Sequence, residues 1–422
     1  MTTTAPVSAG LFYGWRVVAG AFVLATFGWG MGFYGPPVFL SVVSTERDWS
    51  LGLVSSAITV HYLAGALIAG NLPALNRRLG VAGATKAAAL ALGVGVFAWS
   101  IASSPWQLFA AALLSGAGWS AMSAAAVNAI VSPWFVRTRP AALAMAYNGA
   151  SIGGVIFSPL WVAAIAALGF PVAAAAIGLV MLATMWTLAT FVFSRTPQQM
   201  GLAPDGDAPG STAPPSPATS RPRLPGSLLW RDWRFLTLAA AMAFGLFAQI
   251  GLTSHLFSLL TPALGAQHAG LAMGLATALA IGGRTVTGWV MPLRADRRLI
   301  AGVSYALQLA GSLVLAAALG SSGPLLLLGV VLFGLGFGNA TSLPPLIAQV
   351  DFAPEDTARV VPLIVAISQA SYAFAPAAFG LIRELAPHAE AAYGAAPALF
   401  LAAAFVQGLA IAAMLAGRPT RA

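Results

Sequence analysis

Long apolar segments constrain this sequence more than any other feature. Twelve of them alternate with short polar connections, at roughly 14–42, 51–72, 81–102, 105–131, 139–168, 170–196, 233–260, 269–291, 298–320, 323–350, 357–383 and 393–417. About 20 apolar residues in a helix cross a hydrocarbon core about 30 Å thick. A helix also satisfies its own backbone polar groups, which lipid cannot do. The sequence therefore predicts an all-α polytopic membrane protein with twelve transmembrane helices.

Composition supports a membrane protein and excludes several kinds of site. Of the 422 residues, 59% are hydrophobic and 7% are charged, whereas soluble domains carry about 25% charged residues. The net charge is +9, but the basic residues lie at segment ends rather than on one face, so we expect no nucleic-acid partner. The chain has no cysteine, which excludes disulfides and Cys-ligated metals. We expect no cofactor and no metal.

A proline-rich polar stretch divides the chain. It contains the low-complexity run PDGDAPGSTAPPSPATSRPRLPG, and its composition predicts disorder over 197–227. We therefore expect six-helix bundles at 1–196 and 231–422, joined by a linker at 197–230.

Basic residues predict the orientation of the chain. All but Arg47 and Arg383 among the Lys and Arg residues outside the membrane fall on one side of the predicted topology. Cytoplasmic loops carry the excess of Lys and Arg, so both termini and the linker are predicted to be cytoplasmic. Abundant Ala and Gly are typical of a GC-rich bacterial genome, which favours a bacterial inner membrane.

Short matches at a shared offset of about 220 residues relate the two halves. LNRRLG (75–80) corresponds to ADRRL (295–299), and GAGW (116–119) corresponds to GLGF (334–337). Two repeats related by an axis along the membrane normal are typical of a secondary transporter whose site lies between them at the midplane.

Glycine and proline interrupt several predicted spans. The interruptions are GWGMGFYGPPVF (28–39), NGASIGG (148–154) and LPPL (343–346). Small residues allow close packing between helices, and breaks in a helix can also serve as hinges or gates of alternating access. The sequence leaves both interpretations open.

Arg284 is the strongest candidate for a substrate contact. It lies in the apolar stretch Leu271–Arg298, ten residues or about 15 Å before Arg294, which predicts a position near the middle of the bilayer. All eleven Asp and Glu residues fall in predicted loops or at helix ends, so no acidic partner is expected there. Intramembrane charges mark functional sites, and a guanidinium binds a carboxylate with two hydrogen bonds. The alternative is an arginine bonded to the carbonyls of a broken helix.

His61 and His255 are the titratable candidates within the membrane. Either one could contact the substrate or carry a proton during symport. The alternative is a packed histidine bonded to a neighbouring hydroxyl or carbonyl. Neither has an acid beside it, so a catalytic site is excluded and we expect no enzyme.

Uncharged polar and aromatic residues complete the candidate site. Polar groups in lipid must face protein or water, and they either join helices or contact substrate. The candidates are Tyr34, Trp119, Asn128, Asn148, Asn339, Gln369 and Tyr372.

Four motifs resemble one transporter family. WFVRTRPAALAMAYNGASIGG (134–154), YGWRVV (13–18), GLTSHL (251–256) and GRTVTGW (283–289) resemble the monocarboxylate-porter branch of the major facilitator superfamily, which includes oxalate–formate antiporters. The resemblance implies two six-helix bundles and secondary transport of a small organic anion, by proton symport or anion exchange. One chain has enough predicted spans to form a pathway, so we expect it to act as a monomer among membrane lipids.

The chain departs from the family patterns at several positions, including Ala146, which stands where the fifth-helix pattern has its first glycine. PALNRRLG (73–80) has Arg77 where the superfamily carries an aspartate. The oxalate-type members carry a lysine in span eleven, where this chain has neutral residues such as Ser368 and Gln369. One fixed cation suits a monoanion, because a second carboxylate would be buried unpaired. The alternative is a proton-coupled exporter of drugs or other amphiphilic molecules, although such exporters usually use a buried acid.

Overall fold

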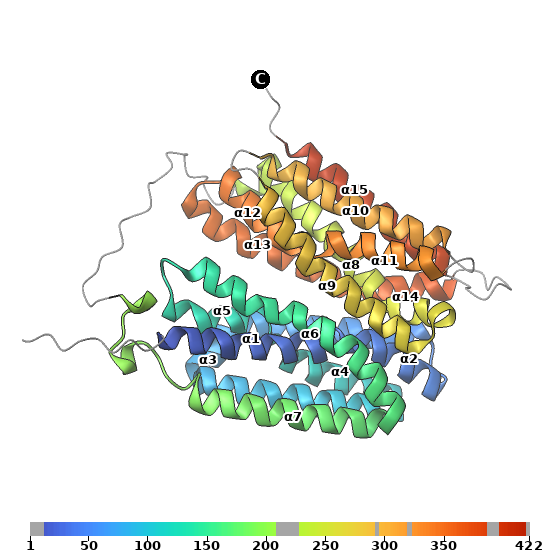
Figure 1. The fold of residues 1–422 in the computed structure, drawn as a ribbon, viewed down its shortest axis with the longest axis horizontal. Coiled ribbons are helices and arrows are strands. Elements are labelled where there is room, and N and C mark those ends of the chain that lie inside the picture. The colour runs from blue at the N-terminus through green and yellow to red at the C-terminus, as the bar shows by residue number, and fades with distance from the viewer. Residues whose placement is uncertain (1–11, 208–227, 292–294, 319–322, 386–395, 419–422) are drawn as a thin grey trace, which may run out of the picture.

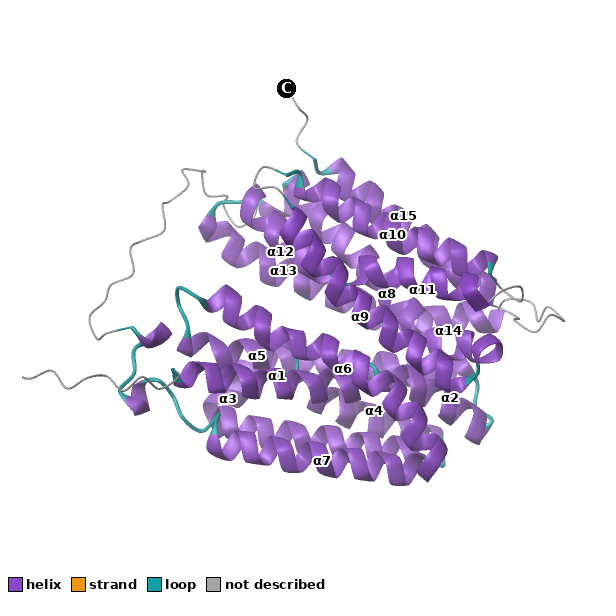
Figure 2. Cartoon of the chain, in the orientation of Figure 1, coloured by secondary structure: helices purple, strands orange, loops and turns teal. Residues whose placement is uncertain are grey.

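The computed structural model describes residues 12–207, 228–291, 295–318, 323–385 and 396–418. Within these ranges the chain folds entirely into helices and turns, without a strand (Figures 1 and 2). Eleven described helices are long and apolar enough to cross a membrane. The prediction of a helical multi-pass membrane protein is therefore confirmed. Arg294 and the predicted linker residues 208–227 lie outside the described ranges.

The difference between eleven helices and twelve predicted spans arises at Gly80. Helix α3 runs from Leu51 to Ile101 over 51 residues, or about 76 Å, which is more than twice the hydrocarbon thickness. At Gly80 its backbone leaves the helical region (φ 68°, ψ 164°), a conformation that glycine adopts without strain. The two arms of α3 correspond to the second and third predicted spans.

Two layers of helices make up the molecule (Figure 1). The N-terminal half comprises α1 (Tyr13–Gly32), α2 (Gly35–Arg47), α3, α4 (Pro105–Ser120), α5 (Ala124–Val131), α6 (Arg139–Leu168) and α7 (Phe170–Phe191). The C-terminal half comprises α8 (Trp233–Leu264), α9 (Ala266–Val290), α10 (Arg297–Ala317), α11 (Gly323–Phe337), α12 (Asn339–Asp351), α13 (Pro354–Ala373), α14 (Ala375–Leu385) and α15 (Ala396–Ala416). Short 3-10 turns are η1 (Ser132–Trp134), η2 (Gln198–Met200), η3 (Pro204–Gly206) and η4 (Leu229–Arg231).

Only some of the predicted interruptions break a helix. The stretch 28–39 does so, because α1 ends at Gly32 and α2 begins at Gly35 with proline in its first turn, where the missing N–H costs nothing. The stretch 148–154 lies inside the continuous helix α6. In span ten the break falls at Gly338, and Pro344 lies inside α12. The break at Gly338 permits a close approach, since a Cβ there would lie 2.2 Å from the carbonyl oxygen of Ala280.

We call the end of the molecule where α1 begins and α7 ends the linker end, and the opposite end the far end. The two halves pack together at the far end, through α2 with α8, α3 with α14 and α6 with α9. Glu384 Oε1 accepts the Gly52 N–H at 2.7 Å, and the Thr59 hydroxyl accepts the Ala377 N–H at 3.2 Å. Toward the linker end, α5 does not pack comparably against α12 or α13 within the described residues. The far end is therefore closed in this conformation.

The first part of the predicted linker is ordered, contrary to the prediction for 197–207. The Asp205 carboxylate accepts the N–H groups of Val136 (3.0 Å), Arg137 (2.8 Å) and Thr138 (3.1 Å) and the Thr138 hydroxyl. Burial alone would raise the pKa of Asp205, but these hydrogen bonds outweigh it and lower the pKa to about 2. Asp207 forms an ion pair with Arg137 at 3.0 Å. Composition predicted disorder because it does not show that one carboxylate can satisfy four donors at the start of α6.

Candidate functional site

Arg284 lies in α9, 18 residues after Ala266 and six before Val290, so its Cα is nearer the linker end than the predicted central position. Side chains of a helix lean toward its N-terminus, which directs the guanidinium toward the far end. Among the described residues Arg284 makes no hydrogen bond or salt bridge, and its Nε is buried without a partner. The residue as a whole is half-buried, and a charge in a membrane-spanning segment is costly without a partner. The arrangement leaves an anion-binding group unoccupied by protein.

Tyr34 connects the N-terminal half to the helix that carries Arg284. It lies at the break between α1 and α2, is 5% exposed and lines a small cavity together with Thr277 of α9. Gly154 of α6 makes room for this contact, because a Cβ there would lie 2.5 Å from Tyr34 Cζ and from Thr277 Cγ2. Tyr34 and Thr277 therefore meet where the halves adjoin, and Arg284 lies about two turns further along α9.

An aromatic cluster lies beside Tyr34. Tyr62 of α3 packs edge-on against Trp119 of α4 (5.3 Å between ring centroids) and against Tyr372 of α13 (6.0 Å). Phe33 connects Tyr62 to Tyr34, with ring centroids 6.2 Å and 5.0 Å from the two tyrosines. Tyrosines of both halves therefore lie in one aromatic cluster, and a phenol can donate a hydrogen bond to a carboxylate. Trp119 is buried, with its Nε1 unpartnered.

Sequence reasoning selected His61 and missed Tyr62. His61 points into the N-terminal half, where its Nε2 lies 2.9 Å from the Gly32 carbonyl and its Nδ1 lies 2.9 Å from the Ser115 hydroxyl. Because consecutive helix residues point about 100° apart, Tyr62 faces the other half. A packed, fully bonded histidine accounts for His61, and its role in substrate binding or proton coupling stays a prediction.

His255 lies at the contact between α8 and α14. It is 0% exposed, and its Nε2 lies 3.1 Å from the Pro376 carbonyl, while its Nδ1 is buried without a partner. Arg383 is close enough to act on it electrostatically and bonds the Ser258 hydroxyl at 2.6 Å. His255 therefore lies at the closed far end. Its Nδ1 is free to bond a ligand or a proton, and its role as a proton carrier or substrate contact stays a prediction.

The predicted amide candidates occupy different environments. Asn339 is buried and donates to the hydroxyls of Thr287 (3.0 Å) and Ser304 (3.1 Å), joining α12 to α9 and α10. Asn128 donates to the Tyr147 hydroxyl and the Ala124 carbonyl.

Two further amide side chains, Asn148 in α6 and Gln369 in α13, are respectively exposed and half-buried. The structure thus brings Tyr34 together with Thr277 of the helix that carries Arg284, with Tyr372 in the same aromatic cluster, whereas Asn339 joins helices of one half.

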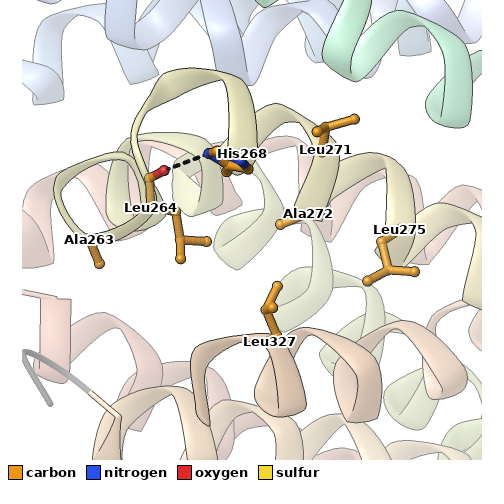
Figure 3. Close-up of a pocket in the computed structure, with 7 residues that line it drawn as sticks. All are labelled: Ala263, Leu264, His268, Leu271, Ala272, Leu275 and Leu327. Atoms are coloured by element: carbon orange, nitrogen blue, oxygen red, sulfur yellow. Dashed lines mark hydrogen bonds between the residues drawn. The ribbon is translucent and has the colours of Figure 1, made fainter. Parts of the chain in front are cut away.

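One cavity lies on the C-terminal half, and a smaller one lies between that half and Tyr34 of the N-terminal half. The larger, of about 420 Å³, lies where α8 meets α9 and is lined mainly by leucines such as Leu271, Leu275 and Leu327 (Figure 3). Its one polar side chain, His268, is hydrogen-bonded through Nδ1 to the Leu264 carbonyl at 3.2 Å. This exposed apolar surface lies away from Arg284. The smaller cavity is lined by Tyr34 and Thr277 and belongs to the site.

Comparison with known proteins identifies the architecture. A family model described as the Major Facilitator Superfamily matches residues 18–376. No curated protein sequence matches the chain.

Two kinds of solved transporter are similar in fold. The nucleoside transporter NupG superposes with a TM-score of 0.72 at 12% identity, covering 97% of this chain and 100% of that one. A bacterial homologue of the human lysosomal transporter Spinster, in an inward-facing and unoccupied conformation, superposes with a TM-score of 0.63 at 14% identity, covering 98% and 100%. At these identities the similarity establishes the fold alone.

Proposed function

Because the chain belongs to the Major Facilitator Superfamily, we propose that it is a secondary transporter that moves a small organic monoanion across a membrane by alternating access. The superfamily and the transporters of similar fold point to a transporter rather than an enzyme. The monocarboxylate-porter branch, which the sequence motifs resemble, makes a monocarboxylate the first candidate.

The observation that carries this proposal is the unpartnered guanidinium of Arg284. Its Nε is buried without a partner, and none of the ion pairs among the described residues includes Arg284. A carboxylate would supply the missing acceptor, since guanidinium and carboxylate pair through two parallel hydrogen bonds. A nucleoside, which NupG transports according to its description, is uncharged and would leave Arg284 unpaired.

A single site charge favours one carboxylate over two. The polar residues Thr277 and Thr287 of α9 and Asn339, which bonds Thr287, are all uncharged. A second buried carboxylate would find no cation there, and its desolvation would oppose binding. Coupling is either by proton symport or by exchange for another anion.

The finer topology belongs to the same proposal. Counting the two arms of α3 separately gives twelve spans. An even number of spans puts both termini and the linker on the same side of the membrane. The basic residues gather at the linker end, whereas Arg47 and Arg383 lie at the far end. This distribution supports a cytoplasmic linker end in a bacterial inner membrane, with six-helix bundles at 1–196 and 231–422.

Thermal stabilisation of the purified protein tests the substrate class. A ligand stabilises the state that it binds by RT ln(1 + [L]/Kd), so millimolar ligand reveals weak sites. We expect a monocarboxylate to raise the melting temperature, with a dicarboxylate and a nucleoside giving smaller shifts. The Arg284→Gln variant should lose the carboxylate shift. Stabilisation by cationic amphiphiles and by no anion would instead favour a drug exporter.

A further inference from the structure

Two arginines share one aromatic ring where α1 begins and α7 ends, at the linker end of the N-terminal half (Figure 1). The guanidinium carbon of Arg16 lies 6.0 Å from the centroid of the Tyr13 ring, and that of Arg195 lies 5.7 Å from the same centroid. We propose that Arg16, Arg195 and Tyr13 form a binding site for the phosphate of an anionic phospholipid. This site is separate from Arg284 and does not depend on which substrate is transported.

Tyr13 fixes the geometry of this lipid site. Its hydroxyl donates to the Phe191 carbonyl at 3.0 Å, and its ring centroid lies 5.2 Å from that of Trp134. The ring is therefore held at the junction of α1 and α7. A guanidinium close to an aromatic ring gains a cation–π attraction, which keeps Arg16 and Arg195 near one another although their charges repel. An anion bound to both arginines would offset that repulsion.

No described acidic residue neutralises these two charges. Within the described ranges, Arg16 and Arg195 take part in no ion pair and donate no hydrogen bond. The ordered start of the linker brings two acids to this end of the molecule. Both of them, Asp205 and Asp207, instead bond residues 136–138. The two guanidiniums are therefore available to an external anion.

The lipid site lies at the depth of phospholipid headgroups. Helix α7 has 22 residues, or about 33 Å, which matches a hydrocarbon core about 30 Å thick. Arg195 follows the end of this helix and therefore lies just outside the core. Before that end, Trp186 is 46% exposed, and the Lys86 ammonium lies 5.2 Å from its ring centroid. Exposed tryptophans and the long side chains of basic residues are typical of the membrane–water interface.

The surroundings favour a lipid over a soluble anion. Arg16 and Arg195 are exposed, so a soluble phosphate would compete with water for them. Phe191, the last residue of α7, bonds Tyr13 through its carbonyl, and its side chain is 66% exposed. A phospholipid can place its phosphate against the guanidiniums through charge-assisted hydrogen bonds and an acyl chain against Phe191. Soluble phosphate would gain only the first of these contacts.

Native mass spectrometry of the purified protein tests the lipid site. The protein in detergent would be titrated with phosphatidylglycerol, which is anionic, or with phosphatidylcholine, which has no net charge. No transport substrate is added. A basic residue near an anionic lipid surface contributes about fivefold in affinity. We expect the wild type to prefer phosphatidylglycerol, and the double variant Arg16→Gln/Arg195→Gln to bind it about tenfold more weakly or worse, with phosphatidylcholine binding unchanged.

A charge-matched control separates this site from general attraction to a basic surface. Arg77→Gln/Arg78→Gln removes two exposed charges from the same half, beside the turn at Gly80, and should keep the preference for phosphatidylglycerol. Equal losses in the two double variants, or no loss in Arg16→Gln/Arg195→Gln, would overturn the proposal.

Inorganic phosphate provides a second control. We expect millimolar phosphate to leave bound phosphatidylglycerol in place, because it cannot replace the contact with Phe191. Displacement at that concentration would mean that the two arginines bind a soluble anion instead of a lipid. If the double variant does not fold, each single variant should still lose affinity for phosphatidylglycerol by about fivefold, and unchanged affinity in both would contradict the assignment.

Discussion

Arg284 raises the free energy of the folded protein, and no interaction with another described residue offsets this cost. A charged side chain within a membrane-spanning helix is costly unless it has a partner, and within the described residues Arg284 forms no salt bridge in return. Arg298 presents the opposite case. It is 2% exposed and bonds the Asp351 carboxylate at 2.9 Å, so its charge stabilises the linker end of the C-terminal half.

This contrast predicts opposite effects of the same substitution. Arg284→Met should raise the melting temperature of the ligand-free protein, because it removes an uncompensated charge, and should abolish stabilisation by carboxylates. Arg298→Met should lower the melting temperature, because breaking a buried pair costs about 3–5 kcal/mol. Differential scanning fluorimetry without ligand measures both. A large fall in melting temperature for Arg284→Met would mean that Arg284 supports the fold rather than the site.

Neighbouring residues 61 and 62 show what sequence reasoning could and could not reach at this scale. Arg284 could be identified from the sequence alone, because it is a charged residue within an apolar segment. His61 stood out for its titratable ring, yet it bonds Gly32 and Ser115 inside one half, and Tyr62 beside it reaches the other half. Which of two adjacent residues faces the interface depends on helix rotation, which hydropathy alone does not determine when both helix faces are apolar.

At the scale of elements, the α3–α14 contact holds the far end closed. Gly380 sits so close that a Cβ would lie 2.0 Å from the Ser55 hydroxyl oxygen and 3.4 Å from Gly52 Cα. The absence of a side chain at Gly380 therefore permits the close approach in which Glu384 bonds Gly52.

Gly380→Val should shift the protein toward a conformation that is open at the far end. Since the native chain contains no cysteine, spin labels on cysteines introduced at the exposed positions Arg47 and Leu385 report the separation of the two halves there. We expect a longer mean distance and slower transport in the variant. Gly282→Val is the control, because a Cβ at Gly282 meets nothing within 4 Å. An unchanged distance would show that the contact does not govern closure.

Asp205 anchors the start of the linker to the α5–α6 connection. Its folded pKa is lowered to about 2, so its stabilising contribution is present above the unfolded pKa of about 3.9 and is lost as the pH falls toward 2. We expect the amides of 136–138 to remain protected from hydrogen exchange between pH 5 and 8. Asp205→Ala should accelerate their exchange at any pH in that range.

The matched control is Asp207→Ala, which removes only the exposed ion pair with Arg137, a kind of contact worth about 0–1 kcal/mol. Equal exchange in Asp205→Ala and wild type would show that the carboxylate does not hold the segment.

Element boundaries were predictable where backbone chemistry acts locally. The sequence predicts a helix break before Pro36 from the backbone properties of glycine and proline, and the structure shows this break between α1 and α2. The break near LPPL was misplaced, because Pro344 and Pro345 are accommodated within α12 while Gly338 meets the carbonyl of Ala280 in α9. That close approach joins helices distant in sequence, which the local pattern does not contain.

For the whole molecule, the two-layer arrangement and the closed far end describe one conformation, which corresponds to one state of the proposed alternating-access cycle. Lipid requires apolar helices of sufficient length, so the helical membrane fold followed directly from hydropathy. Hydropathy did not predict which helices of the two halves pack together, namely α2 with α8, α3 with α14 and α6 with α9. The sequence fits both an outward-open and an inward-open arrangement of the same halves.

Transport in proteoliposomes tests the central claim most directly. Radiolabelled propanoate would be offered to vesicles containing the wild type, Arg284→Lys or Arg284→Gln, with either a pH gradient or unlabelled acid inside. We predict uptake by the wild type under at least one gradient, weaker uptake by Arg284→Lys, which keeps the charge but not the two-pronged geometry, and none by Arg284→Gln. Equal uptake by wild type and Arg284→Gln, or no carboxylate uptake by the wild type under either gradient, would contradict the account.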